Sequence, residues 1–161
     1  MAAKAIRELD PRKCSEIIDE IVRLEKKLFP KHESLARNFH DELQKKNTGL
    51  LYMKFSEEEE DGEIVGYVMY SWISSLCASI TKLAVKENYR RRGYGEALLK
   101  AAIQKCRTRR IQRVCLHVDP TRTPAVSLYQ KLGFQIDELV KSYYSSDRNA
   151  FRMYVDFTDD S

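Results

Sequence analysis

The sequence lacks the features that mark secreted, disulfide-bonded or membrane proteins. Its four cysteines (Cys14, Cys77, Cys106 and Cys115) form no Cys-x-x-Cys pair. Hydrophobic residues make up 43% of the 161 residues, which is enough for a core without a disulfide framework. No apolar run reaches the length of a membrane span, and the first residues lack the apolar stretch of a secretory signal. We therefore expect reduced thiols and a cytoplasmic protein, with the nucleus as a second location and no membrane partner.

An excess of one charge is also lacking. Twenty-eight Lys and Arg face 24 Asp and Glu, so the net charge is only +4, and we expect no nucleic-acid partner. The sequence contains no internal repeat and no low-complexity linker. Its length is typical of one compact domain, so we predict a single domain over residues 1–161 with its core at about 5–157.

The first half of the sequence predicts two helices and a hairpin. Asp10 and Pro11 are typical of a helix start, and the residue before Pro30 resists the helical conformation, so one helix should end near Phe29. Hydrophobic spacing predicts the other elements: a strand over 5–9, a helix over 33–44, and paired strands over 50–55 and 64–72. The acidic segment 56–62 between those strands is interpreted as a solvated turn.

The second half alternates strands and helices. We predict strands over 78–85, 114–118, 135–144 and 151–157, and helices over 95–106 and 124–131. A hairpin-built part followed by a strand–helix–strand unit indicates a mixed α/β (α+β) fold.

A phosphate-binding pattern follows the predicted strand 78–85. Three arginines, Arg90 to Arg92, precede Gly93-Tyr94-Gly95 at a helix start. Amides at a helix start favour anions, arginine adds positive charge, and glycine lets a ligand approach the backbone. The Gly-Lys-Ser/Thr ending of a P-loop and the third glycine of a dinucleotide-binding loop are both missing. A surface helix with solvated arginines would give the same local pattern.

Two motifs in this order resemble those of the GNAT acetyltransferase superfamily. Arg90-x-x-Gly93-x-Gly95 resembles its Gln/Arg-x-x-Gly-x-Gly/Ala pyrophosphate loop, and Ala125–Phe134 resembles its Ala-x-x-Leu-Tyr-x-x-x-Gly-Phe signature. The resemblance covers residues 5–157 and implies a mixed, mostly antiparallel sheet of about seven strands with about four flanking helices. It also implies an acyltransferase that needs acetyl-CoA and no metal, and that transfers acetyl to a primary amine directly in a ternary complex.

Three weaker features are similar to protein N-terminal acetyltransferases: Phe29-Pro30, His117 within Leu116-His117-Val118, and Tyr143-Tyr144. This similarity implies that the substrates are protein or peptide N-termini, and it leaves open an auxiliary subunit. Lysine side chains, a small amine, and a non-catalytic CoA-binding scaffold remain as alternatives.

The resemblance also implies residue roles. The backbone of Leu83, Ala84 and Val85 would contact the thioester and pantetheine, and the pyrophosphate would be held by Arg90, Arg91, Arg92, Gly93, Tyr94, Gly95 and Glu96. Tyr129 would contact the cofactor and protonate the departing thiolate, since a tyrosine with a pKa near ~10 keeps its proton at neutral pH.

His117 faces away from its apolar neighbours and has a suitable intrinsic pKa, which makes it the candidate base. Glu25, a water chain or a backbone carbonyl could replace it. Two departures from the family pattern matter here: Ser79 stands where some relatives have a catalytic tyrosine, and Arg122 stands where asparagine is common. Phe29, Pro30, Tyr143 and Tyr144 are the substrate-binding candidates, although each could be ordinary packing.

Overall fold

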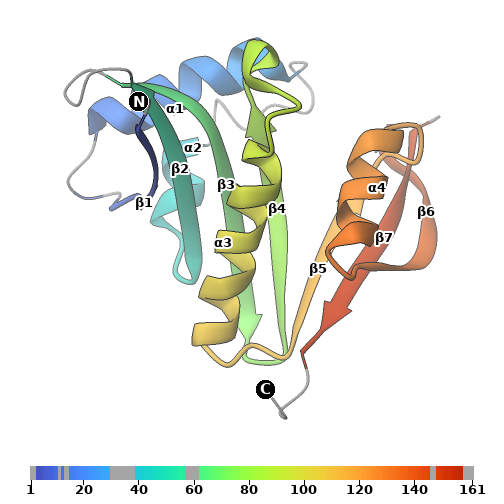
Figure 1. Cartoon of the computed structure of the whole chain (residues 1–161). Helices are drawn as coiled ribbons and strands as arrows, with labels where there is room; N and C mark the ends of the chain where they lie inside the picture. Colours follow the sequence, from blue (N-terminus) through green and yellow to red (C-terminus); the bar gives the residue numbers. More distant parts are fainter. Residues whose placement is uncertain are drawn as a thin grey trace. The chain divides into compact units, whose positions relative to one another are not determined.

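The computed structural model describes residues 3–10, 12, 15–29, 39–56, 62–145 and 148–157. In chain order, the elements are β1 (Ala3–Glu8), α1 (Ser15–Leu28), α2 (Phe39–Gln44), β2 (Thr48–Ser56), β3 (Glu63–Ser74), β4 (Cys77–Val85), a short 3-10 helix η1 (Glu87–Tyr89), α3 (Tyr94–Thr108), β5 (Arg113–Val118), α4 (Thr123–Lys131), β6 (Gln135–Ser145) and β7 (Arg148–Asp156) (Figure 1). The strand order is β1-β2-β3-β4-β5-β7-β6. The β4–β5 pair is parallel, whereas β1–β2, β2–β3, β5–β7 and β6–β7 are antiparallel. The predicted mixed fold with a mostly antiparallel sheet is confirmed.

Internal contacts group the chain into two compact units. The first comprises Met1–Ser71 with Lys82–Ala102, and the second comprises Trp72–Thr81 with Ile103–Ser161. The expectation of one domain stays a prediction. Within the described residues, no helix is both long enough and apolar enough to cross a membrane.

In the first unit, α1 and α2 bury their apolar faces in one hydrophobic cluster. Ile18, Ile21 and Leu24 of α1 are at most 4% exposed, in agreement with their helical spacing. Phe39 and Leu43 of α2 join the same cluster, while the predicted start of that helix, including Leu35, lies outside the described residues. Ahead of α1, Asp10 Oδ1 accepts a hydrogen bond from the Arg12 amide at 3.0 Å.

Strand β3 is buried along most of its length, as expected for a central strand. Its pairing with β2 shifts between Met53 and Lys54, which leaves an extra residue on β3 next to Gly66. A Cβ atom at Gly66 would lie 2.8 Å from the Ala84 carbonyl oxygen and 3.0 Å from Leu98 on α3. Glycine at this position therefore allows α3 to pack closely against β3 and β4.

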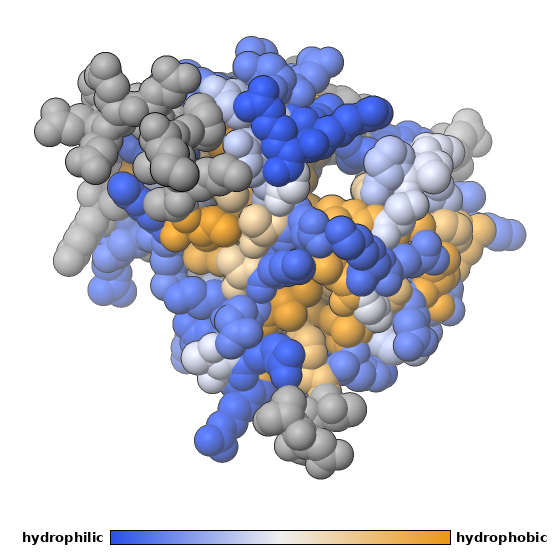
Figure 2. Space-filling view, viewed as in Figure 1, coloured by the Kyte–Doolittle hydropathy of each residue, from blue (hydrophilic) through white to orange (hydrophobic). Residues whose placement is uncertain are grey.

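In the second unit, β5 buries Val114, Cys115 and Leu116 in succession before His117. Leu116 and Val118 are buried, whereas His117 between them is exposed, which confirms the predicted orientation. Strand β6 ends the strand order and exposes Ile136, Leu139 and Tyr143. Hydrophilic residues cover much of the face shown in Figure 2, with apolar residues visible between them.

Candidate active site

Glu63 on β3 anchors the segment that joins β4 to α3. Its carboxylate accepts hydrogen bonds from Lys86 Nζ at 2.7 Å and from Tyr89 Oη at 2.6 Å. These two hydrogen bonds hold the pKa of Glu63 below its usual value, and the bond from Lys86 makes the larger contribution. Lys86 precedes η1 and Tyr89 is its last residue, so Glu63 fixes the start of the loop against the sheet.

The three arginines of the loop differ in their contacts. Arg90 turns back to the strand, and its Nε donates to the Val85 carbonyl oxygen at 3.0 Å. Arg91 has a left-handed backbone with φ of 63°, and the Arg92 guanidinium lies 5.3 Å from the centre of the Tyr89 ring. All three arginines are exposed. Arg90 therefore stabilises the loop, and the charges of Arg91 and Arg92 are presented at its surface.

At the two glycines of the motif, no neighbouring atom lies close enough to exclude a Cβ atom. Gly93 has a φ of 81°, a conformation that favours glycine, and a Cβ atom there would meet no atom within 4 Å. At Gly95 a Cβ atom would meet only Val85, at 3.7 Å, an ordinary contact distance. The Ala97 amide bonds to the Gly93 carbonyl at 3.0 Å, so the first helical turn opens directly at this motif. Amides of a first turn point out of the helix end and favour an anion.

The end of β4 lies beyond its pairing with β5. The register runs from Ala78 opposite Val114 to Ile80 opposite Leu116 and includes no later residue of β4. Leu83, Ala84 and Val85 follow this last pair, with Ala84 buried in the core and the other two half-buried.

Tyr129 lies near the end of α4, and the signature around it closes the helix. The Phe134 amide donates to the Tyr129 carbonyl and the Gly133 amide to the Gln130 carbonyl, both at 3.0 Å, and Gly133 has a φ of 96°. This is the Schellman arrangement, which explains the spacing from tyrosine to Gly-Phe. Tyr129 is half-buried, and burial raises the pKa of its hydroxyl while Arg122 opposes the shift. The phenol therefore keeps its proton at neutral pH.

His117 and the two tyrosines of β6 form one aromatic cluster in the second unit. The His117 and Tyr143 rings stack at 4.2 Å between centres, and the Tyr143 and Tyr144 rings meet edge to face at 4.9 Å. Desolvation, followed by the positive charge of Arg152, lowers the pKa of His117, and Glu138 opposes this. The imidazole is therefore neutral at physiological pH and able to accept a proton.

Tyr129 interacts electrostatically with Tyr144 of this cluster. Burial raises the pKa of Tyr144 to about 12, with smaller contributions from Tyr143, Asp119 and Tyr129, and Arg122 opposes them. Arg122 itself makes no side-chain hydrogen bond that caps α4. The second unit thus contains four predicted site residues, of which His117, Tyr143 and Tyr144 contact one another and Tyr129 interacts electrostatically with Tyr144.

Phe29 belongs to the first unit, together with the Arg90–Gly95 loop. The Lys82 ammonium lies 3.6 Å from the centre of the Phe29 ring and 3.5 Å from Glu25 Oε1, and Tyr67 Oη donates to Glu25 Oε2 at 2.8 Å. The Glu25 side chain is fully buried. Pro30, the other half of the predicted substrate loop, lies outside the described residues.

Sequence reasoning missed two polar contacts beside these residues. Lys82 was interpreted only as part of a strand, yet it links Phe29 to Glu25. Asp119, which directly follows β5, pairs with Arg148 of β7 at 3.2 Å. Each partner lies far from the other along the chain, so no local pattern could have indicated the pair.

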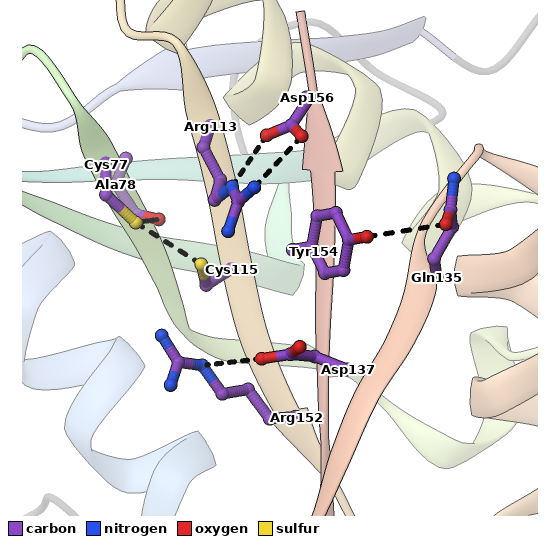
Figure 3. A network of polar contacts seen from close by, with 9 residues as sticks. All are labelled: Cys77, Ala78, Arg113, Cys115, Gln135, Asp137, Arg152, Tyr154 and Asp156. Atoms are coloured by element: carbon purple, nitrogen blue, oxygen red, sulfur yellow. Dashed lines mark hydrogen bonds and ion pairs between the residues drawn. The ribbon is translucent and has the colours of Figure 1, made fainter.

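A shallow depression elsewhere in the second unit contains none of the predicted site residues. It measures about 610 Å³ and is lined by Leu76, Cys77, Gln112, Arg113, Arg152, Asp156 and Phe157. Cys77 of this lining and Cys115 are free thiols whose Sγ atoms lie 3.2 Å apart (Figure 3). Burial and Cys115 raise the pKa of Cys77 to about 11, with Arg113 and Arg152 opposing. Cys77 is therefore protonated at neutral pH, which argues against a thiolate nucleophile here.

Comparisons with known proteins agree with this description. The model of the acetyltransferase (GNAT) family matches residues 16–134. The chain is 30% identical over 148 residues to an N-alpha-acetyltransferase of Sulfurisphaera tokodaii, covering 84% of this chain and 85% of the relative. It is 32% identical over 148 residues to an N-alpha-acetyltransferase of Sulfolobus acidocaldarius, covering 84% of each. The chain therefore belongs to the GNAT acetyltransferase family, and it is an acyltransferase.

A solved structure supports the fold. The Arabidopsis thaliana NAA60 structure in complex with acetyl-CoA matches with a TM-score of 0.80, over 96% of this chain and 99% of that one. The sequence identity is 17%, so this likeness concerns the fold alone.

Proposed function

We propose that this acetyltransferase moves an acetyl group from acetyl-CoA to the α-amino group of protein or peptide N-termini, by direct transfer in a ternary complex. The observation that carries the proposal is the cluster in which His117 stacks on Tyr143, with Tyr144 against it. This cluster places a neutral imidazole against aromatic side chains whose hydroxyls can bond a peptide backbone.

Acetyl-CoA would bind at the β4–α3 loop. Arg91 and Arg92 with the first-turn amides of α3 would hold the pyrophosphate, and the backbone from Leu83 to Val85 would contact the pantetheine arm. The loop fits this role because Gly93 adopts a left-handed conformation and because Gly95 has no packing reason to lack a side chain. When bound, acetyl-CoA supplies a thioester carbonyl that an amine can attack.

Two side chains would move protons in this reaction. His117 would accept the proton of the attacking amine, since its lowered pKa leaves it neutral at physiological pH. Tyr129 would donate to the departing thiolate, since its raised pKa keeps it protonated. A backbone amide near Leu83–Val85 would stabilise the oxyanion.

The preference for an α-amine follows from its lower pKa. An α-amino group has a pKa of about 8 and a lysine of about 10.4, so deprotonating lysine at neutral pH costs roughly 3 kcal/mol more. A histidine with a lowered pKa is a weak base, which suits the easier substrate. The names of the two archaeal relatives support the same class of substrate.

The test is a panel of peptides with varied first residues, each made with and without an internal lysine and with a free or a blocked N-terminus. We expect mass spectrometry to place the acetyl group on the free N-terminus. Blocking that terminus should abolish most of the activity even when a lysine is present. Faster turnover of a blocked, lysine-bearing peptide or of a free polyamine would overturn the substrate proposal and leave the family assignment intact.

A further inference from the structure

Tyr143 and Tyr144 lie in an irregular part of β6. Val140 pairs with Ala150 of β7, whereas Ser145 pairs with Arg148, so β6 carries extra residues between these two pairs. Ser142 within the extra segment has a φ of 55°, which a residue other than glycine seldom adopts. Its amide donates to Asn149 Oδ1 at 2.9 Å. The two tyrosines thus lie where the regular strand pairing is interrupted, so side-chain contacts must help to fix them.

The contacts around these tyrosines form a closed ring that starts at Asp119, just after β5, and ends at His117 near the end of β5. Arg148 Nη2 donates to Asp119 Oδ2 at 3.2 Å, and the same guanidinium lies 5.0 Å from the centre of the Tyr144 ring. Tyr144 contacts Tyr143 edge to face, and Tyr143 stacks on His117. His117 and Asp119 are two residues apart, so the ring closes through the backbone.

Asp119 is itself held in place from its other side. Its Oδ1 accepts from the Thr121 amide at 2.9 Å and from the Thr121 hydroxyl at 2.8 Å, and its carbonyl accepts from the Arg122 amide at 3.0 Å. The Asp119 side chain is only 15% exposed. This turn leads directly into α4, the helix that bears Tyr129. Through Arg148, the Asp119 carboxylate therefore links this turn to Tyr144 of β6.

We propose that Asp119 and Arg148 are positioning residues that hold Tyr143 and Tyr144 in the arrangement that receives the first residues of a substrate. The proposal rests on the proposed function, because it assumes a peptide that contacts these tyrosines. A segment that is already ordered loses less conformational entropy when a peptide binds. Breaking the ion pair should therefore weaken peptide binding more than it slows the chemical step.

The chain offers a matched control at the other end of the same two strands. Arg113 of β5 pairs with Asp156 of β7 at 2.6 and 3.0 Å, and its guanidinium lies 4.4 Å from the centre of the Tyr154 ring (Figure 3). This Arg–Asp–Tyr group has the same composition as Arg148, Asp119 and Tyr144. It contains none of the predicted site residues.

The experiment compares Arg148→Met, Arg148→Lys, Asp119→Asn and the control Arg113→Met by steady-state kinetics with a free-N-terminus peptide. We expect Arg148→Met and Asp119→Asn to raise the KM for peptide by roughly 3- to 10-fold, a common size for coupling between contacting residues. The KM for acetyl-CoA and kcat should change less than 2-fold by the same reasoning. Arg148→Lys keeps the charge and should recover part of the effect, and Arg113→Met should leave both KM values unchanged.

A second measurement does not depend on activity. The Tyr143 ring shifts the NMR resonances of the stacked His117 ring, so these resonances should move in Arg148→Met and stay in place in Arg113→Met. Equal peptide KM values in these two variants, or an unmoved His117 resonance in Arg148→Met, would overturn the positioning role. A wild-type enzyme that acetylates no free N-terminus would instead overturn the proposed function and the substrate part of this proposal. In that case, the His117 resonances in Arg148→Met would still decide whether the ion pair positions the tyrosines.

Discussion

The ring of His117 lies flat against the ring of Tyr143, with centres 4.2 Å apart and planes 8° from parallel. The histidine comes from β5 and the tyrosine from the irregular part of β6, so the stack joins a regular strand to an interrupted one. One face of the imidazole is covered, and Arg152 adds a positive charge nearby. Both effects favour the neutral imidazole that a general base requires.

The first prediction concerns the pH dependence of activity. The pKa of His117 is lowered from 6.5, so the neutral form is present at and above that pH, and kcat/KM should fall only as the pH drops through the lowered value. Arg152→Met removes a charge that lowers this pKa, so the acidic limb of the profile should move to higher pH. His117→Gln should remove the limb. If the limb keeps its position in both variants, the base lies elsewhere, and Glu25 becomes the next candidate.

A second prediction addresses the phosphate site. Gly95→Asp places a negative charge at the proposed pyrophosphate site and should weaken acetyl-CoA binding about 100-fold, because like charges brought together cost several kcal/mol. Gly95→Ala is the control, since a Cβ atom there meets only Val85 at 3.7 Å and should not disturb the fold. Calorimetry gives the affinity, and circular dichroism shows whether each variant is folded. Wild-type affinity in a folded Gly95→Asp variant would mean that phosphate binds elsewhere.

A third prediction concerns the proposed acid. Tyr129→Phe keeps the ring, including its edge-to-face contact with Phe134 at 5.9 Å, and removes the proton. We expect kcat to fall by about 10²-fold or more, with acetyl-CoA affinity little changed. Single-turnover kinetics should accompany the steady-state rates, so that the chemical step is known to be measured. An unchanged single-turnover rate would reject the role.

A fourth prediction concerns the buried carboxylate of α1. Glu25→Leu leaves Lys82 and the Tyr67 hydroxyl without their shared partner and should lower the free energy of unfolding by about 3 kcal/mol. The double variant Glu25→Leu/Lys82→Met also removes the ammonium that Glu25 contacts and should recover part of that loss. Urea unfolding measures both. A double variant no more stable than Glu25→Leu would show that the ion pair is not the main contribution.

Much of the fold was predictable because local patterns determine it. The strand and helix ranges were predicted to within a few residues, including the helix that begins at Tyr94 and the strand that carries His117, apart from the helix predicted over 33–44, whose start lies outside the described residues. The Leu-Tyr-x-x-x-Gly-Phe spacing reflects a local helix ending, in which Gly133 adopts a positive φ and Phe134 bonds back to Tyr129. Such features depend on residues close in sequence.

Other features were not predictable, because they depend on strand register and on irregularities within strands. The interruption of β6 is centred near Ser142, a residue whose type gives no sign of a positive φ. The same irregular segment carries Tyr143, whose ring the structure stacks on His117. An alternating pattern states which face of a strand a side chain occupies, but it does not name the neighbour on that face.

The sequence by itself determined the helices and strands, the family motifs, and the residue types available for catalysis, because these follow from local conformation and spacing. The tertiary structure decided which of these side chains meet. It placed His117 against Tyr143, Asp119 against Arg148, and Lys82 between Glu25 and Phe29. These contacts join segments far apart in the chain, and they form only when strand pairing and core packing have fixed the register of each element.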